Sequence, residues 1–244
     1  MRKEKQKMKK YETKKVLVAC EESQRVCSAF RDRGFEAYSC DLIECSGGHP
    51  EWHIQQDVTT ILNPINNKIE FNTVDGQHHI ITGEWDLIIA HPPCTYLTVS
   101  GNRWFNIERY GDRARERWKL REEAANFFLL FSKASCKHIA IENPIGYMNS
   151  HFRKPNQTIQ PFEFGHPERK ATCLWLINLP ILTPTDLVDP NITVLGDGKT
   201  YSDWHLKTLR LSKEERSKER SKTYPGIAAA MAQQWGDYIL KENN

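Results

Sequence analysis

The chain has 244 residues, of which 39% are hydrophobic and 27% charged, a composition typical of a globular protein large enough for one α/β domain. No apolar run has the length of a membrane span, and the Lys-rich N-terminus lacks the apolar segment of a secretion signal, so we expect a cytoplasmic protein without membrane contacts. The net charge is only +3, but positive charge gathers in residues 1–15, with eight basic and two acidic side chains, and between Lys207 and Lys222, with seven and three.

The first third of the chain predicts the start of a parallel sheet. Residues 16–20 form a buried-strand pattern, residues 23–33 carry apolar side chains at helical spacing before Gly34, and residues 36–42 indicate a second strand. Residues 64–83 are polar and rich in turn signals, which predicts a small hairpin insert.

The rest of the chain continues this alternation. Residues 86–90 predict a strand that the following prolines end, residues 111–135 a long helix, and residues 138–142 a strand stopped by Asn143 and Pro144. Residues 173–179 predict another strand, and Pro225 begins a final helix that runs to Leu240. We therefore expect an α/β fold with a doubly wound, mostly parallel sheet.

Ligands of doubly wound sheets bind outside the carboxyl ends of the strands, so the residues at those ends are the candidate site. Cys94 follows two prolines there, where a thiol could act as a nucleophile if a partner activated it. Glu142 ends a neighbouring strand, and a carboxyl group in a closed pocket has a raised pKa and can donate a proton. The alternatives without a catalytic role are that Cys94 is a buried thiol in apolar surroundings and that Glu142 is a capping carboxylate.

The cofactor expected from these strand ends is cationic. Asp41 and Asp57 follow the second and third strands, where a carboxylate often holds ribose hydroxyls. The first turn contains Cys20, Glu21 and Glu22 in place of the glycine fingerprint for a pyrophosphate. Because acidic side chains repel phosphates and attract a sulfonium, this turn favours S-adenosylmethionine over a dinucleotide.

The cysteines give no sign of a disulfide framework or of a metal site. Their number, seven, is odd, and several lie in apolar runs, which favours reduced thiols. Cys40, Cys45, His49 and His53 lie close in sequence, but they lack both the close cysteine pair and the distant histidine pair of a zinc finger. We expect no bound metal.

Four motifs, in order along the chain, resemble those of the cytosine-C5 DNA methyltransferases. DLIIAHPPCTYLT (86–98) is similar to the family's Pro-Cys nucleophile loop, and IENP (141–144) to its Glu-Asn motif. HPERKATCLWL (166–176) is similar to its arginine-bearing motif, and YPGIAAAMAQQWG (224–236) to its C-terminal cofactor-closing helix. SGGHPEWHI (46–54) is reminiscent of compact, phage-type members.

The resemblance implies a sheet of the S-adenosylmethionine-dependent methyltransferase type and methylation of cytosine at carbon 5. Cys94 would add to carbon 6, Glu142 would contact ring nitrogen 3 and the exocyclic amine, and Arg169 would steady the base or the loop. Thr95 to Trp104 would close over a cytosine flipped out of double-stranded DNA. The implied cofactor residues are Cys20, Glu21, Asp41, Asp57, Pro92 and Gly226.

The implied organisation is a flexible basic tail, residues 1–15, before a single methyltransferase domain, residues 16–244. Within it, residues 180–224 would form a reduced target-recognition region, whose basic side chains either contact phosphates or form a solvated helix face. These side chains are Arg210, Arg216, Arg220 and Lys222. A monomer is the default expectation, and roles in restriction-modification or phage self-protection both stay open.

Two features depart from the family and keep two alternatives open. CEESQ (20–24) replaces the family's Gly-rich first motif, and His91 replaces a small residue before the prolines. One alternative is an amino-methyltransferase, which needs an aromatic residue where Cys94 stands, although Tyr96 is near. The other is a catalytically inactive nucleic-acid-binding protein with the same fold.

Overall fold

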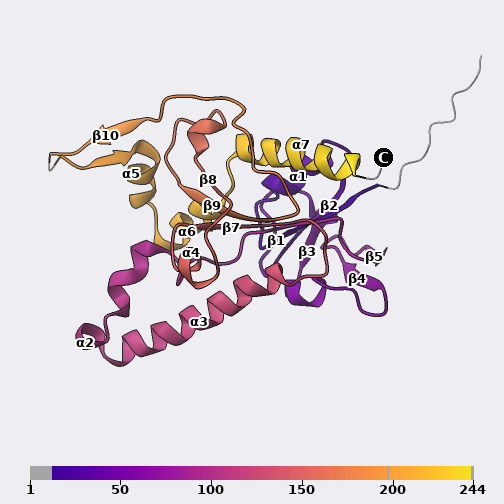
Figure 1. Ribbon diagram of the computed structural model, residues 1–244, viewed down its shortest axis with the longest axis horizontal. Helices are drawn as coiled ribbons and strands as arrows, with labels where there is room; N and C mark the ends of the chain where they lie inside the picture. Colours follow the sequence, from indigo (N-terminus) through magenta and orange to yellow (C-terminus); the bar gives the residue numbers. More distant parts are fainter. Residues whose placement is uncertain (1–12, 197, 243–244) are drawn as a thin grey trace, which may run out of the picture.

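A seven-stranded sheet with the order β3-β2-β1-β6-β7-β9-β8 is the centre of the computed structural model, which describes residues 13–196 and 198–242 (Figure 1). Six of its strands are parallel, and β9 runs antiparallel between β7 and β8. The strands are β1 (Lys15–Ala19), β2 (Glu36–Asp41), β3 (His53–Gln55), β6 (Leu87–Ala90), β7 (Ile139–Pro144), β8 (Gln157–Ile159) and β9 (Thr172–Ile177). The expected α/β fold with a mostly parallel sheet is confirmed.

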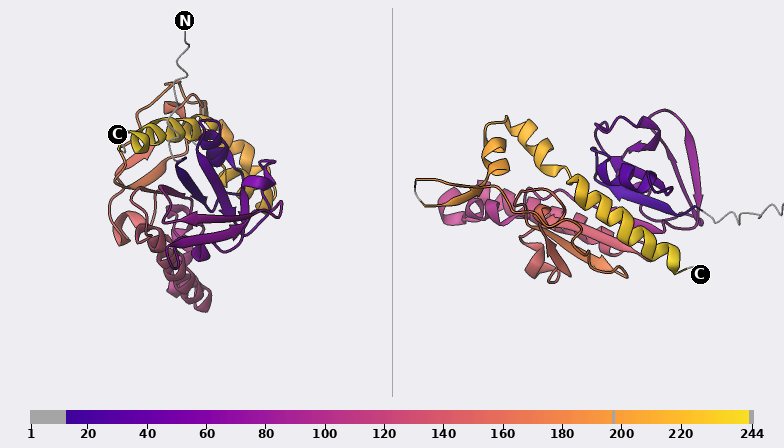
Figure 2. Two further views of the ribbon diagram at one scale, coloured as in Figure 1. Left: turned by 90° about the vertical axis from the view of Figure 1, so that its right-hand side faces the viewer. Right: turned by 90° about the horizontal axis from the view of Figure 1, so that it is seen from above.

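Each face of the sheet is covered by a separate hydrophobic core. Val16 and Val18 of β1 face the core that α1 and α7 complete, whereas Leu17 and Ala19 face the core built with α3 and the β4-β5 hairpin (Figure 2). Because both faces are buried, strands β1, β6 and β9 are mostly apolar, as buried strands of parallel sheets usually are. The covering elements are α1 (Arg25–Arg31), α3 (Asp112–Ser132), α4 (Met148–His151), α7 (Pro225–Lys241), β4 (Lys68–Asn72) and β5 (His78–Thr82).

The expectation that Asn143 and Pro144 stop the fourth parallel strand was wrong. Strand β7 continues to Pro144 because β9 pairs with it in the opposite direction, with Glu142 opposite Leu174 and Pro144 opposite Thr172. The sequence predicted the neighbouring strand over residues 173–179 but neither its direction nor its pairing with β7, so the extra length of β7 could not be expected. Glu142 consequently lies inside a strand, where its direction is fixed.

The basic tail expected over residues 1–15 overlaps the folded part of the chain at its end. Strand β1 begins at Lys15, and Lys14 Nζ lies 2.6 Å from Asp86 Oδ1, so both lysines belong to the folded part. Residues 1–12 of the predicted tail lie outside the described residues. Among residues 13–196 and 198–242, no helix is long and apolar enough to cross a membrane.

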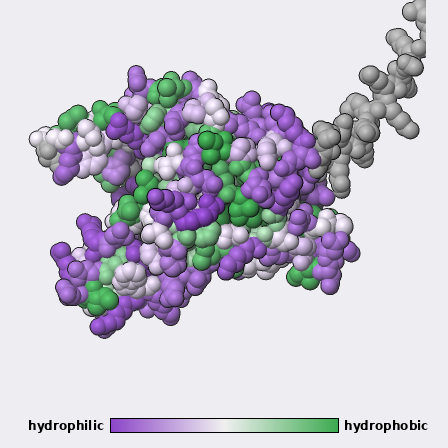
Figure 3. All heavy atoms as spheres, viewed as in Figure 1, coloured by the Kyte–Doolittle hydropathy of each residue, from purple (hydrophilic) through white to green (hydrophobic). Residues whose placement is uncertain are grey.

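Two segments project from the same side of the sheet (Figure 1). One consists of the 3-10 helix η3 (Val99–Phe105), α2 (Ile107–Tyr110) and the N-terminal half of α3, and the other of β10 (Ile192–Val194), β11 (Thr200–Ser202) and α5 (Asp203–Leu209). Figure 3 shows a hollow between the two projections. The remaining helices are α6 (Lys213–Ser221), η1 (Pro50–Trp52), η2 (Val58–Thr60) and η4 (Pro161–Glu163).

Candidate active site

A pocket of about 350 Å³ lies where the strand order reverses, at the carboxyl ends of β1 and β6. In an open α/β sheet this position is where a ligand is expected. Three of the residues that the sequence predicts for cofactor binding, Cys20, Glu21 and Asp41, line this pocket. Its other lining residues are Glu22, Ser23, Ile43, His91, Glu214, Ser217, Lys218, Ser221 and Thr223.

Two buried glutamates make the floor of this pocket acidic. Glu21 accepts hydrogen bonds from the backbone N–H groups of Val26 and Cys27, at 2.7 and 3.1 Å, and so serves the N-terminus of α1. Burial raises its pKa, although the nearby His91 opposes this effect. Both carboxylate oxygens of Glu22 are buried without a hydrogen-bond partner, and Lys218 Nζ lies 3.8 Å away. A buried acceptor without a partner is costly, so this group is suited to a bound donor or cation.

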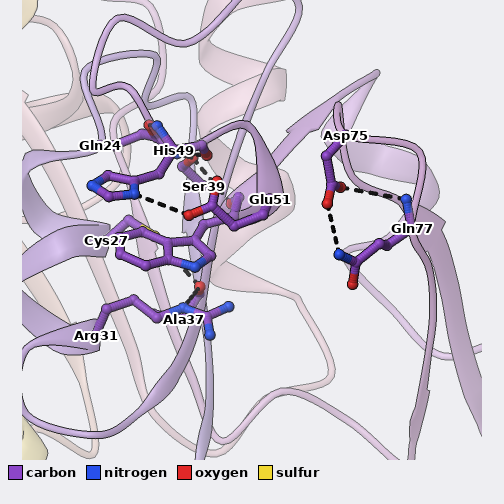
Figure 4. Close-up of polar contacts among 10 residues, drawn as sticks. Gln24, Cys27, Arg31, Ala37, Ser39, His49, Glu51, Asp75 and Gln77 are labelled. Carbon is purple, nitrogen blue, oxygen red and sulfur yellow. Dashed lines mark hydrogen bonds and ion pairs between the residues drawn. The ribbon is translucent and has the colours of Figure 1, made fainter.

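The turn after β1 adopts left-handed backbone conformations without using glycine. Cys20 has φ 59° and Gln24 has φ 56°. Gln24 compensates by clamping the next loop: its side chain donates to the carbonyl of His49 at 2.8 Å and accepts from the N–H of His49 at 3.0 Å (Figure 4). Burial raises the pKa of the Cys20 thiol, which makes Cys20 unsuited to act as a nucleophile.

The other predicted cofactor residues do not all reach the pocket. The carboxyl group of Asp41 lines it, and burial raises the pKa of that group. Asp57 is exposed and caps η2 by accepting from Thr59 N at 2.9 Å. Pro92 is buried with its carbonyl bonded to Asn143, and Gly226 lies against Phe164. None of Asp57, Pro92 and Gly226 is among the lining residues.

His91 joins this pocket to Glu142. Ala90 is in register with Ile141, so the next residues on the two strands are neighbours, and His91 Nδ1 lies 3.0 Å from Glu142 Oε2. The other ring nitrogen, Nε2, is buried without a partner, and the ring lines the pocket. The sequence identified His91 as a strand-end residue and as a departure from the family, but no local signal predicted its contact with Glu142.

The pKa of Glu142 differs in direction from the expectation. Burial alone would raise it, as the sequence suggested, but the hydrogen bond and charge of His91 and the charge of Lys170 outweigh burial and lower it. Glu142 is therefore a carboxylate held in the ionised form. It can donate a proton only after receiving one.

Cys94 is half-buried beside Glu142 and is not sealed in apolar packing. Burial and the charge of Glu142 raise the pKa of its thiol, while the charges of Lys170 and Arg220 act in the opposite direction. Its carbonyl accepts from Leu97 N at 2.9 Å, which begins the turn after the two prolines. Cys94 and Glu142 therefore lie near enough for the charge of the carboxylate to raise the pKa of the thiol.

Lys170 is a candidate site residue that the sequence analysis did not single out. Its positive charge lowers the pKa values of both Cys94 and Glu142. Its Nζ donates to the carbonyl of Lys222 at 3.2 Å, and burial lowers the pKa of Lys170 itself. Its neighbour Arg169, which the resemblance selected, is exposed and affects neither group. The motif HPERKATCLWL places two cations side by side, and only the fold decides which one points inward.

The region expected to recognise the target contributes to this site. Helix α6 supplies Glu214, Ser217, Lys218 and Ser221 to the pocket wall, and Lys170 Nζ lies 5.9 Å from the ring centres of both Trp204 and Tyr224. These contacts place residues 204–224 over the strand edge.

The basic side chains of this region have different surroundings. Arg216 donates to three carbonyls, those of Thr208, Leu209 and Leu211, and so holds the C-terminus of α5. Lys222 pairs with Glu219 at 2.9 Å, and Arg220 lies 5.5 Å from the centre of the Trp204 ring. Arg210 is exposed, and the described residues give it no side-chain partner. Arg210 therefore remains the most accessible of the four for a phosphate.

The candidate metal cluster is dispersed among other contacts. His53 Nδ1 lies 2.9 Å from Ser39 Oγ, the His49 ring stacks on Trp52, and Cys40 is buried. Within the described parts of the chain, no group of three or more His, Cys, Asp or Glu side chains could hold a metal ion. All seven cysteines, each of which the structure describes, are free thiols.

The arrangement places a thiol and a histidine–carboxylate pair beside an acidic pocket. Cys94, Lys170 and Glu142 form an electrostatically coupled group, and His91 extends from Glu142 into the pocket wall. Perturbed titrating groups at the ligand-binding edge of a sheet are typical of an active site. No protein-family model matches the chain, and no curated protein shows significant sequence similarity to it.

Proposed function

We propose that this protein is an S-adenosylmethionine-dependent methyltransferase that methylates cytosine at carbon 5 in DNA, with Cys94 as the nucleophile. The observation that carries the proposal is the coupling of Cys94 with Glu142 and Lys170 directly beside the acidic pocket, with His91 belonging to both. The single antiparallel strand near one edge of an otherwise parallel sheet is compatible with the methyltransferase type of fold.

The acidic pocket fits the proposed cofactor. The buried oxygens of Glu22 have no hydrogen-bond partner, and a ligand with an ammonium and a sulfonium group would supply positive charge to them. Asp41 stands at the end of β2, where a ribose hydroxyl could be held, and the ring of His91 offers an unpaired nitrogen. S-Adenosylmethionine, when bound, supplies an electrophilic methyl group.

The side chains can be assigned proton and bond changes that balance. The Cys94 thiol releases its proton to solvent and its sulfur forms a bond to carbon 6, while nitrogen 3 takes a proton from Glu142, which first receives it from solvent. Carbon 5 then takes the methyl group and loses its proton to a base. With water as that base, the bond between sulfur and carbon 6 breaks, the ring double bond returns, and Cys94 leaves as a thiolate that takes a proton from solvent. Nitrogen 3 returns its proton through Glu142 to solvent.

The proton on Glu142 also activates Cys94. The negative charge of Glu142 raises the pKa of the thiol, so protonating Glu142 removes that effect while the positive charge of Lys170 remains. The nucleophile thus becomes more acidic at the stage when nitrogen 3 is in place to accept a proton. This coupling explains how a thiol with a raised pKa in the free protein can still react.

The amino-methyltransferase alternative receives less support. It requires an aromatic side chain at the strand end, and the nearest candidate, Tyr96, lines a different cavity with Arg117 over its ring at 4.9 Å. Cys94→Ser separates the two reactions, because only the cytosine-C5 reaction needs the thiol.

The test is incubation of the full chain with labelled S-adenosylmethionine and double-stranded DNA, followed by nucleoside analysis. We expect label in 5-methylcytosine, and a covalent adduct when the DNA contains 5-fluorocytosine. Cys94→Ser should abolish both, whereas Cys136→Ser, which changes a thiol bonded to Trp85 and His138 carbonyls, should abolish neither. Label in N-methylated bases, or full activity of Cys94→Ser, would reject the proposal.

A further inference from the structure

A second cavity, separate from the acidic pocket, lies on the projection formed by residues 99–121, which we name the arginine arm. The cavity has a volume of about 420 Å³. It is lined by Tyr96, Trp104, Tyr110, Arg113, Glu116, Arg117 and Leu120. Three aromatic rings and two guanidinium groups therefore share one opening.

The aromatic rings of this cavity are available for contact with a ligand. The Trp104 side chain is 42% exposed, and its ring lies 5.1 Å from that of Tyr110. Arg103 lies over the Trp104 ring at 4.6 Å, and Arg109 lies 5.4 Å from the centre of the Tyr110 ring. A solvent-facing tryptophan flanked by arginines is unusual for a surface whose only role is solubility.

The charge of the arm indicates an anionic partner. Residues 103–121 contain seven basic and three acidic side chains. Arg113 is exposed, and the described residues give its guanidinium no hydrogen-bond or ion-pair partner, while Arg117 Nε is buried without an acceptor. Phosphates satisfy such groups, and planar bases stack on aromatic rings and guanidinium planes.

The cavity is also continuous with the candidate nucleophile loop. Tyr96 stands two residues after Cys94, and Arg117 Nη2 donates to the carbonyl of Thr95 at 3.4 Å. The arm faces the hollow between the two projections that Figure 3 shows. A strand that brings a base to Cys94 would have its neighbouring nucleotides within reach of this surface.

We propose that the cavity of the arginine arm binds an unpaired nucleotide of a nucleic-acid strand, with its base stacked on the exposed ring of Trp104 and its phosphate at Arg113. The inference rests on the proposed function for the choice of a nucleic acid as partner. The cavity is then a stacking site outside the catalytic group. It distinguishes a nucleotide that carries a base from one that lacks it, but it does not distinguish one base from another. Single-stranded or locally opened segments should therefore bind better than intact duplex.

The test compares two labelled strands of equal length and charge, an oligothymidine and its abasic counterpart, by fluorescence anisotropy without cofactor. The wild-type protein should prefer the strand with bases, and Trp104→Ala should lose about 5- to 100-fold in affinity for that strand only. Arg113→Gln should weaken binding of both strands and reduce the slope of log affinity against log salt by about 0.7.

Matched variants on the same arm control for folding and for general charge. Trp118 is 41% exposed but lines another cavity, so Trp118→Ala should keep the preference for bases. Arg115 pairs with Asp112 at 2.6 Å and lies outside the cavity, so Arg115→Gln should keep it as well. Circular dichroism of each variant verifies the fold.

The outcomes separate this inference from the proposed function. Equal binding of the two strands by the wild-type protein, or an unchanged preference in Trp104→Ala, overturns the stacking site even if the protein methylates cytosine. A preference that depends on Trp104 in a protein without methyl transfer supports the stacking site and rejects the enzyme. Binding is therefore measured separately from nucleoside analysis.

Discussion

Lys170 and Arg169 are adjacent cations of which only Lys170 acts on the candidate catalytic residues. Lys170→Met keeps most of the side-chain volume and removes the ammonium, so the pKa of the Cys94 thiol should rise and less thiolate should form. We expect kcat/KM for methyl transfer to fall by about 100-fold, as when other preorganised charges are removed, and its increase with pH to move to higher pH. Steady-state rates across a pH series measure both effects.

Arg169→Met is the matched control for this substitution, because it removes the same charge one residue earlier. It should leave the pH profile unchanged. Equal losses in the two variants, with unaltered pH profiles, would mean that these cations serve only to attract nucleic acid.

The pair of His91 and Glu142 makes stability depend on pH in a defined direction. The pKa of Glu142 is lowered from 4.5 in the folded protein, so the contribution of the pair is fully present above the ordinary carboxyl pKa and is lost as pH falls through the folded-state value. Because the two side chains are 8% and 17% exposed, His91→Leu leaves a buried carboxylate without a partner. We expect a cost of about 3 kcal/mol near neutral pH.

The destabilisation by His91→Leu should be smaller at a pH well below 4.5 than near neutral pH, because protonating Glu142 removes the charge that His91 partners. Urea unfolding of the two proteins at both pH values measures the change. His91→Asn, which retains a donor for the carboxylate, should recover part of the loss near neutral pH. A cost that is independent of pH would show that His91 contributes only packing.

At the scale of elements, the loop after β6 is fastened to the loop after β7 at Gly146. A Cβ atom at Gly146 would lie 1.9 Å from the Leu97 carbonyl oxygen, and Tyr147 N donates to the same oxygen at 2.7 Å. Gly146→Ala should therefore separate the two loops, destabilise the protein by about 3 kcal/mol and displace Cys94 from Glu142. Thermal unfolding and kcat together test this.

Gly196 gives the matching control, because a Cβ atom there would meet no atom within 4 Å. Gly196→Ala should leave both stability and kcat unchanged. If Gly146→Ala were as stable as the wild-type protein, the close approach of the two loops would not exist in solution.

The sequence predicted those elements whose own residues carry a signal, such as an apolar run in a buried strand or turn residues in a hairpin. Strands β1 and β6 are continuous apolar runs because both sheet faces are covered, and the hairpin of β4 and β5 carries strong turn signals. Strand β8 has three residues, two of them polar, and owes its existence to pairing with β9. Such a strand has no local signal to detect.

At the scale of the whole molecule, the sequence predicted where the site lies but not which other segments pack around it. It predicted that Cys20, Glu21, Asp41 and His91 lie close together, as they do in one pocket, because the topology of a parallel sheet brings the carboxyl ends of its strands together. It could not place α6 over that pocket, because a charged surface helix has no sequence feature that specifies its packing partner. The inward direction of Lys170 depends on the same long-range packing.

The acidic pocket predicts opposite effects of one substitution on the free and the ligand-bound protein. The carboxylate of Glu22 is buried without a hydrogen-bond partner, and its ion pair with Lys218 spans 3.8 Å, so its burial costs stability that a bound donor would offset. Glu22→Gln removes the buried charge, so the free protein should gain about 1–2 kcal/mol and melt about 3–6 °C higher.

S-Adenosylmethionine at about 100 times its dissociation constant should stabilise the wild-type protein by about 2.7 kcal/mol, and the same concentration should stabilise Glu22→Gln much less. Differential scanning fluorimetry with and without the cofactor measures both effects. Glu214→Gln, a change on α6 in the wall of the same pocket, shows whether any lost carboxylate has this result. A Glu22→Gln protein that is less stable when free, or that gains as much from the cofactor as the wild type, would show that Glu22 has a purely structural partner and that the pocket does not use it for a cation.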